Sequence, residues 1–130
     1  MVLNQAMVMR RPKEDEEREE RIQMEIVVDA NGPEEQAMGW YCYLENELHF
    51  PFRAKCIAQR AISPLRKRQE VEVVELAPEE ECEHEMFVGV AWEGRTLAVP
   101  LSQLGIIKAD KATTQAVEDW YYWVARGYEF

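Results

Sequence analysis

The periodicity of the apolar residues changes twice along this 130-residue chain, and that order constrains the fold more than any other feature. From residue 33 to 48 the apolar side chains recur at helical spacing: Ala37, Trp40, Tyr41, Leu44 and Leu48. Residues 70–76, EVEVVEL, alternate in the way of a strand with one wet face. Residues 113–126 are helical in pattern again. Helix, strand and helix in this order predict an α+β fold.

We expect an N-terminal helical pair. The first helix is predicted from Lys13 to about Val28, supported by acid-first i,i+4 pairs, Glu14–Arg18 and Glu17–Arg21. Residues 29–33, DANGP, end it because they combine turn-forming residues.

The second helix is predicted to begin at Pro33, because proline suits the first helical position. Asn31 or Gly32 would cap it. We expect it to end near Leu48, since Pro51 prevents continuation.

The centre of the chain, from Phe52 to Ile107, is predicted to be strand and loop. Its apolar or alternating segments are FRAKCIAQR, EVEVVEL, MFVGVAWEG and TLAVPLSQLGII, with EGR as a hairpin signal. Four or five strands with short connections indicate a small antiparallel curled sheet or an SH3-like barrel.

A C-terminal helix, capped by Thr113 or Thr114 and ended by Gly127, should pack on this sheet. Its expected buried stripe is Val117, Trp120, Tyr121 and Val124, which leaves Tyr122 and Trp123 on the less apolar side. The predicted core of the protein is Trp40, Leu44, Val73, Phe87, Val90, Leu97, Val99, Trp120 and Val124. We expect residues 1–12 to form a flexible tail and residues 13–130 a single domain.

The net charge of -10, from 15 basic and 25 acidic residues, argues against binding to nucleic acid or to anionic membranes. It favours cations or a basic protein partner. No apolar run has the length of a membrane helix, and the first residues lack the pattern of a secretory signal. The chain has three cysteines, an odd number with no short spacing, so we expect reduced thiols in a cytoplasmic protein. We also expect a monomer.

The sequence does not favour an enzyme. His49 and His84 are its only histidines, and it contains no nucleophile elbow, phosphate-binding glycine loop or dinucleotide fingerprint. A zinc site is also disfavoured, because Cys82 and His84 are spaced poorly for tetrahedral ligation from one loop.

Hard oxygen ligands are the strongest chemical theme, since Ca²⁺ takes roughly six to eight oxygens in flexible geometry. Three clusters offer them. The first surrounds the DANGP turn: Asp29, Asn31, Glu34 and Glu35. The second precedes a predicted strand: Glu79, Glu80, Glu81, Glu83 and Glu85. The third lies at the end of the second helix: Glu45, Asn46 and Glu47.

None of these clusters is an EF-hand. In residues 29–40 the glycine comes fourth instead of sixth, and Trp40 stands in place of the bidentate glutamate. The basic segment Arg66, Lys67 and Arg68 is expected to be a solvated turn, or to neutralise one acidic cluster within the fold.

Several long phrases of the sequence resemble the small calcium-binding protein family known from cyanobacteria, the CcbP-like group. They are MEIVVDANGPEEQAMGWYCYLENELHFPF, APEEECEHEMFV, LAVPLSQL and AVEDWYYWVARGY, within residues 20–130. The resemblance implies a calcium-binding protein without EF-hands, which binds Ca²⁺ through its acidic surface for calcium buffering or signalling. The alternative is an acidic protein–protein interaction module with a small β-barrel.

For the location of binding, we expect the carboxylates at the DANGP turn, assisted by Glu79 to Glu83 if the two loops meet in space. Ca²⁺ should bind in preference to Mg²⁺, because surface carboxylates on flexible loops suit a large ion of irregular geometry.

Overall fold

The computed structural model describes residues 15–130, and its elements follow the predicted order. The helices are α2 (Glu16–Arg21), the π-helix η1 (Ile22–Ile26), α3 (Pro33–Glu47) and α4 (Lys111–Ala125). The strands are β1 (Phe52–Cys56), β2 (Glu70–Leu76), β3 (Phe87–Trp92), β4 (Arg95–Pro100) and β5 (Leu104–Lys108). Two short 3₁₀ helices are η2 (Glu79–Cys82) and η3 (Leu101–Gln103). The predicted tail, Lys13 and Glu14 lie outside the described residues.

The strands form one antiparallel sheet in the order β4-β3-β2-β1-β5, with β4 and β5 at its open edges. The α+β fold with an open antiparallel sheet is thus confirmed, whereas the SH3-like comparison stays a prediction. β1 alternates buried and exposed residues strictly, as the sequence indicated. The predicted hairpin joins β3 to β4, where Glu93 and Gly94 both adopt positive φ angles of 47° and 82°.

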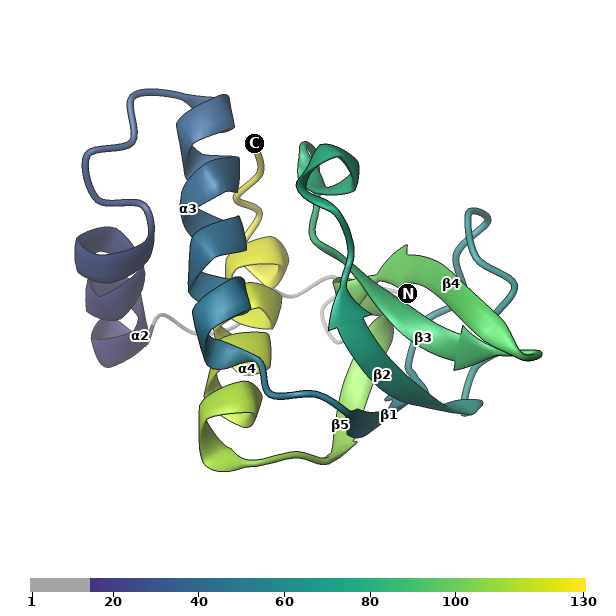
Figure 1. Ribbon diagram of the computed structural model, residues 1–130. Helices are drawn as coiled ribbons and strands as arrows, with labels where there is room; N and C mark the ends of the chain where they lie inside the picture. The colour runs from purple at the N-terminus through teal and green to yellow at the C-terminus, as the bar shows by residue number, and fades with distance from the viewer. Residues whose placement is uncertain (1–14) are drawn as a thin grey trace, which may run out of the picture.

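Helices α2, α3 and α4 lie side by side on one side of the molecule, and the sheet lies on the other (Figure 1). The short helix η2 rises from the sheet toward the N-terminal end of α3. The C-terminus of the chain lies between them (Figure 1). This arrangement brings the start of α3 close to η2, although β1 and β2 lie between them in the sequence.

The core joins the helices to the inner face of the sheet. The Trp40 ring of α3 meets the Trp120 ring of α4 edge-on, with centroids 5.1 Å apart. Six of the nine predicted core residues are buried: Trp40, Leu44, Val73, Val90, Val99 and Trp120. Phe87 and Leu97 are half-buried, and Val124, which is 36% exposed, was predicted wrongly.

The buried face of α4 differs from the predicted stripe. Tyr121 and Val124 are exposed, whereas Tyr122 and Trp123 are buried. The reason is the fully buried carboxylate of Asp119, which a count of apolar residues places on the surface. Because that carboxylate faces inward, the neighbouring Tyr122 turns inward as well.

Asp119 is held by three side chains from two other helices, α2 and α3. The Arg21 guanidinium donates to both carboxylate oxygens, at 2.9 and 2.7 Å, and the Tyr43 hydroxyl donates at 2.7 Å. Arg18 lies 3.3 Å from the same carboxylate. The hydrogen bond to Asp119 raises the pKa of Arg21. The pKa of Tyr43 is raised mainly by burial and, to a smaller extent, by its own hydrogen bond to Asp119. The predicted pair of Glu17 with Arg21 is therefore wrong, because Arg21 reaches across to α4.

The ends of α2 and α4 also differ from prediction. The first helix passes into the π-helical turn of η1 and ends at Ile26, two residues before the predicted Val28. At α4 the cap is Asp110, whose carboxylate accepts the Thr113 backbone N–H at 2.8 Å. Thr113 is not the cap because its hydroxyl accepts the His49 backbone N–H instead, at 2.8 Å.

The predicted helix start at Pro33 and its glycine cap are confirmed, since Gly32 caps α3. α3 ends at Glu47, within one residue of the prediction. None of the helices in residues 15–130 combines the length and apolar content needed to cross a bilayer. Cys42, Cys56 and Cys82 are all free thiols.

Candidate functional site

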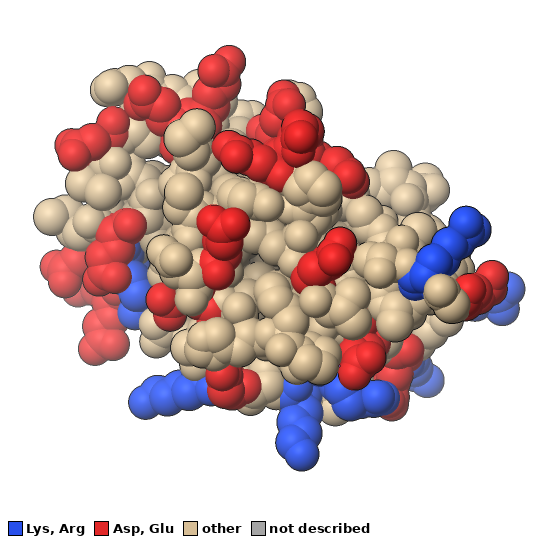
Figure 2. Space-filling model, in the orientation of Figure 1, with Lys and Arg blue, Asp and Glu red and all other residues tan. Residues whose placement is uncertain are grey.

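An acidic cleft lies where the start of α3 faces η2. It has a volume of about 880 Å³ and is lined by Pro33, Glu34, Ala37, Met38, Tyr41, Glu79, Glu80, Cys82, Glu83, His84 and Phe130. Figure 2 shows Asp and Glu side chains gathered at this end of the molecule (upper part of the view), whereas Lys and Arg lie toward the lower and right edges. Two of the three predicted acidic clusters thus contribute to one cleft.

One face of α3 forms the first wall of the cleft. Its lining residues Glu34, Ala37, Met38 and Tyr41 follow each other at helical spacing, so they share a face. The Tyr41 hydroxyl donates to the Ala77 carbonyl oxygen at 2.8 Å, which ties α3 to the residues just before η2.

Tyr41 also reports the negative charge around it. Burial raises the pKa of its hydroxyl, and the side chains of Cys82, Glu45, Glu79 and Glu80 raise it further through the negative charge they carry when ionised. Glu45, from the third predicted cluster, therefore lies near this wall, although it does not line the cleft.

The second wall is η2, and its single buried residue anchors it. Cys82 is 1% exposed, and its sulfur accepts the Phe87 backbone N–H at 3.4 Å. Burial raises the pKa of this thiol, which keeps it protonated and makes it a poor zinc ligand. With Cys82 turned inward, Glu79, Glu80 and Glu83 are left exposed along the cleft.

Glu85 does not belong to this wall. Its carboxylate pairs with the Arg60 guanidinium at 2.8 Å, and this hydrogen bond raises the pKa of Arg60. The suggestion that Arg66, Lys67 and Arg68 neutralise an acidic cluster is therefore wrong for Glu85, because Arg60 neutralises it instead.

The DANGP turn contributes less to the cleft than we expected. Asp29 has a left-handed backbone with φ of 61°, and the Glu35 carboxylate accepts the Asn31 backbone N–H at 2.6 Å. These contacts shape the turn. Of the first predicted cluster, only Glu34 lines the cleft. The lining also lacks Glu81 of the second cluster and both Glu45 and Glu47 of the third.

The cleft does not present a closed ligand set. Among residues 15–130, no three His, Cys, Asp or Glu side chains are already gathered as they would be around a metal ion. The lining carboxylates are exposed, so they would have to converge from solvated positions onto an ion.

Besides the four predicted carboxylates, the cleft is lined by seven residues that were not predicted as site residues: Pro33, Ala37, Met38, Tyr41, Cys82, His84 and Phe130. The spacing of Met38 and Tyr41 from Glu34 was a usable signal, because positions i, i+4 and i+7 lie on one helix face. His84 follows the acidic run directly. No sequence signal places Phe130, since the path of the C-terminus depends on tertiary packing.

Comparison with known proteins identifies the family of this chain. A family model described as calcium binding, that of CcbP, matches residues 20–124. The chain belongs to the CcbP calcium-binding family. A search of curated proteins found no match.

Two solved structures are similar to this CcbP-family protein. The crystal structure of Anabaena CcbP is 43% identical, with a TM-score of 0.81, over 92% of this chain and 98% of that chain. A structure described as a calcium-binding protein in the calcium-binding form is also 43% identical, with a TM-score of 0.79, over 89% of this chain and 95% of that chain. The predicted family is therefore confirmed, with almost the whole length of both relatives covered.

Proposed function

We propose that this protein binds Ca²⁺ in the cleft between α3 and η2, with Glu34, Glu79, Glu80 and Glu83 as carboxylate ligands. The observation that carries the proposal is that these four acids, from two separate elements, line one cleft. Membership of a calcium-binding family and the similar structure in its calcium-binding form support it.

Electrostatics favours a divalent ion at this position. Two carboxylates about 4 Å apart in water repel each other by about 1 kcal/mol, and a cation between them reverses the sign of that energy. The gain increases with each acid that converges. The positive end of the α3 dipole opposes a cation, but Glu34 and Glu35 in the first turn offset it.

The open geometry favours Ca²⁺ over Mg²⁺. Ca²⁺ accepts irregular oxygen coordination, whereas Mg²⁺ requires a near-octahedral site and gives up its waters reluctantly. Exposed glutamates lose side-chain entropy when they converge on an ion, which limits how many of them bind it. We expect water molecules to supply the remaining ligands. Zn²⁺ should bind weakly, because the buried Cys82 thiol is bonded within the fold.

We propose a binding protein rather than an enzyme, acting as a monomer in the cytoplasm in calcium buffering or signalling. The remaining predicted ligands, Asp29, Asn31, Glu35, Glu81, Glu45 and Glu47, stay candidates for a further ion.

The alternative is a basic protein partner at the same cleft. The observation that favours it is apolar surface among the acids, since Met38 is 55% exposed there and Phe130 also lines the cleft. A basic segment with an apolar side chain would match both features.

Calorimetric titration of two double variants tests the proposal. Glu34→Gln with Glu80→Gln removes two charges from the cleft, whereas Glu20→Gln with Glu72→Gln removes two from exposed positions on α2 and β2. We expect the cleft variant to lose calcium affinity at least tenfold and the control to change little. Equal loss in both variants would show a diffuse ion atmosphere, and full affinity in the cleft variant would place the ion elsewhere.

A further inference from the structure

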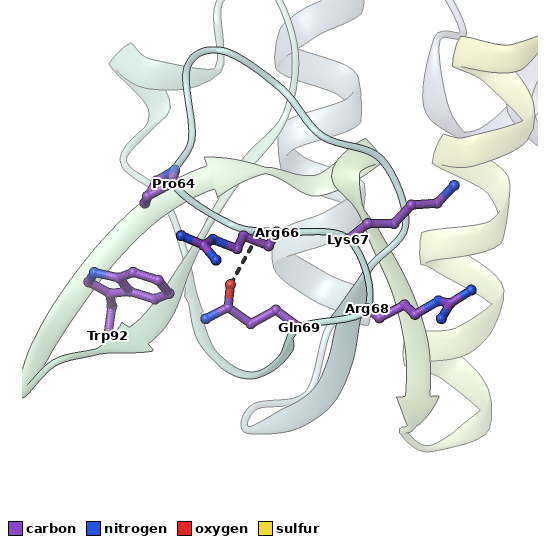
Figure 3. Close-up of a pocket in the computed structure, with 6 residues that line it drawn as sticks. All are labelled: Pro64, Arg66, Lys67, Arg68, Gln69 and Trp92. Carbon is purple, nitrogen blue, oxygen red and sulfur yellow. Dashed lines mark hydrogen bonds between the residues drawn. The ribbon is translucent and has the colours of Figure 1, made fainter.

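A second hollow lies on the sheet side of the molecule and is chemically unlike the acidic cleft. It has a volume of about 670 Å³ and is lined by Pro64, Arg66, Lys67, Arg68, Gln69 and Trp92 (Figure 3). We call it the basic cup. Its lining has three cationic residues and no acidic one, in a protein whose net charge is -10.

Backbone hydrogen bonds set the shape of this loop. The Cys56 N–H donates to the Gln69 carbonyl at 2.8 Å, and the Arg68 N–H donates to the Cys56 carbonyl at 2.7 Å. Arg68 is left-handed, with φ of 77°, a conformation that is unfavourable for a residue other than glycine. Leu65, which is buried, anchors the loop in the core. The cup is therefore a defined structure.

The polar groups that face the cup are hydrogen-bond donors. The Gln69 side-chain oxygen accepts the Arg66 backbone N–H at 3.0 Å, which leaves the amide nitrogen of Gln69 to donate. In Figure 3 the Arg66 guanidinium and the Gln69 amide extend toward the Trp92 indole, whereas Lys67 and Arg68 extend the other way.

In the part of the chain that the structure describes, the side-chain nitrogens of Arg66 and Gln69 donate to no other residue. Across residues 15–130, no ion pair involves Arg66, Lys67 or Arg68. The carboxylate of Glu70, which follows Gln69 in sequence, forms an ion pair with the Arg53 guanidinium, with nitrogen and oxygen 2.6 Å apart. The cup thus offers a guanidinium, an amide donor and a half-buried aromatic ring to a ligand.

The chemistry of these groups selects the ligand. A guanidinium matches a phosphate through paired N–H donors, and an indole face stacks on a planar ring. A peptide backbone would also need acceptors for its own N–H groups. Among the side chains that line the cup only Gln69 carries an acceptor, and its oxygen already accepts the Arg66 N–H. The overall negative charge repels a polymer of phosphates more than a single one.

We propose that the basic cup binds a nucleoside monophosphate, with its phosphate on Arg66 and Gln69 and its base against Trp92. This site is separate from the acidic cleft and does not depend on calcium binding.

The test is a titration of the full chain with AMP in metal-free buffer, followed by NMR at the Trp92 indole N–H. Arg66→Gln removes the phosphate partner, and Lys67→Gln is the matched control, because it removes an equal charge from the adjacent side chain that extends away. We expect saturable binding of one AMP, weakened about tenfold by Arg66→Gln and by less than threefold by Lys67→Gln. Trp92→Leu, checked for folding by thermal melting, should weaken AMP binding but not the binding of inorganic phosphate.

Four results would overturn the proposal. They are an absence of saturable AMP binding, equal effects of Arg66→Gln and Lys67→Gln, phosphate binding as tight as that of AMP, and a single-stranded oligonucleotide binding more tightly than AMP.

Discussion

Replacing Gly39 by alanine should destabilise this protein, although the same change stabilises most helices. Gly39 lies within α3, where alanine is normally favoured over glycine by about 1 kcal/mol. Here an added Cβ would overlap the Ile26 carbonyl oxygen and would lie 3.3 Å from the Ile26 carbonyl carbon. Both of these are backbone atoms at the end of η1, so they cannot rotate away.

The overlap must be relieved by moving η1 away from α3. Overpacking of this kind costs about 1–3 kcal/mol and occasionally more, which exceeds the gain in helix propensity. Because backbone atoms must move, we expect a cost in the upper part of this range, about 2–3 kcal/mol. Less the propensity gain of about 1 kcal/mol, the net loss is about 1–2 kcal/mol, which corresponds to a melting temperature lower by roughly 3–8 °C.

Urea denaturation followed by tryptophan fluorescence measures this loss. The control is Gly32→Ser at the α3 cap. A Cβ added at Gly32 would have no neighbouring atom within 4 Å, and the φ of 173° suits any residue. Serine should cap the helix and leave stability equal or slightly higher. A Gly39→Ala variant as stable as the wild type would mean that η1 does not approach α3 as closely as described.

Two further predictions concern buried and exposed ion pairs. Asp119→Asn should cost about 2–4 kcal/mol in urea denaturation, because it leaves guanidinium groups without their buried counter-charge, and Tyr43→Phe should cost less. An Asp119→Asn variant of wild-type stability would contradict the network. The Nδ1 of His49 bonds the Asp110 carboxylate, which raises the pKa of His49 and lowers that of Asp110 to about 2. The stabilisation by His49 is complete below its ordinary pKa of about 6.5 and is lost as pH rises through the raised value, whereas that by Asp110 is lost only as pH falls toward about 2. The melting temperature of His49→Gln should therefore fall below that of the wild type by more at pH 6 than at pH 9, and an equal difference at both would refute the pair.

The alternation of short strands made the sheet predictable. β1 and β2 alternate because each has one face on the core and one in water, and that alternation is visible in the sequence. The start of α3 was equally clear, because proline at the first helical position leaves few alternatives.

The orientation of α4 was not predictable from apolar spacing. Its buried face includes Asp119, and a buried carboxylate becomes favourable only when Arg21 and Tyr43 from two other elements meet it. Local sequence carries no record of such partners, so the predicted stripe was rotated toward Val124.

The candidate site was predictable in part: its acidic residues were visible in the sequence, but their common cleft was not. The acidic runs stand out in the sequence, and Glu34, Glu79, Glu80 and Glu83 were among the predicted ligands. That they share one cleft depends on the packing of α3 against η2 through Tyr41 and Ala77, a contact between distant parts of the chain. The density of acids around the DANGP turn did not indicate that Asp29 lies outside the lining of the cleft, because local density of charge does not show which side chains converge.

The location of calcium binding is tested most directly by NMR titration of the ¹⁵N-labelled protein with Ca²⁺ and, separately, with Mg²⁺. We predict saturable Ca²⁺-dependent shifts that are largest at the amides of residues 33–41 and 79–84, with weaker binding of Mg²⁺. Shifts confined to residues 29–31 or 45–47, or equal affinity for the two ions, would contradict a calcium site in the cleft between α3 and η2.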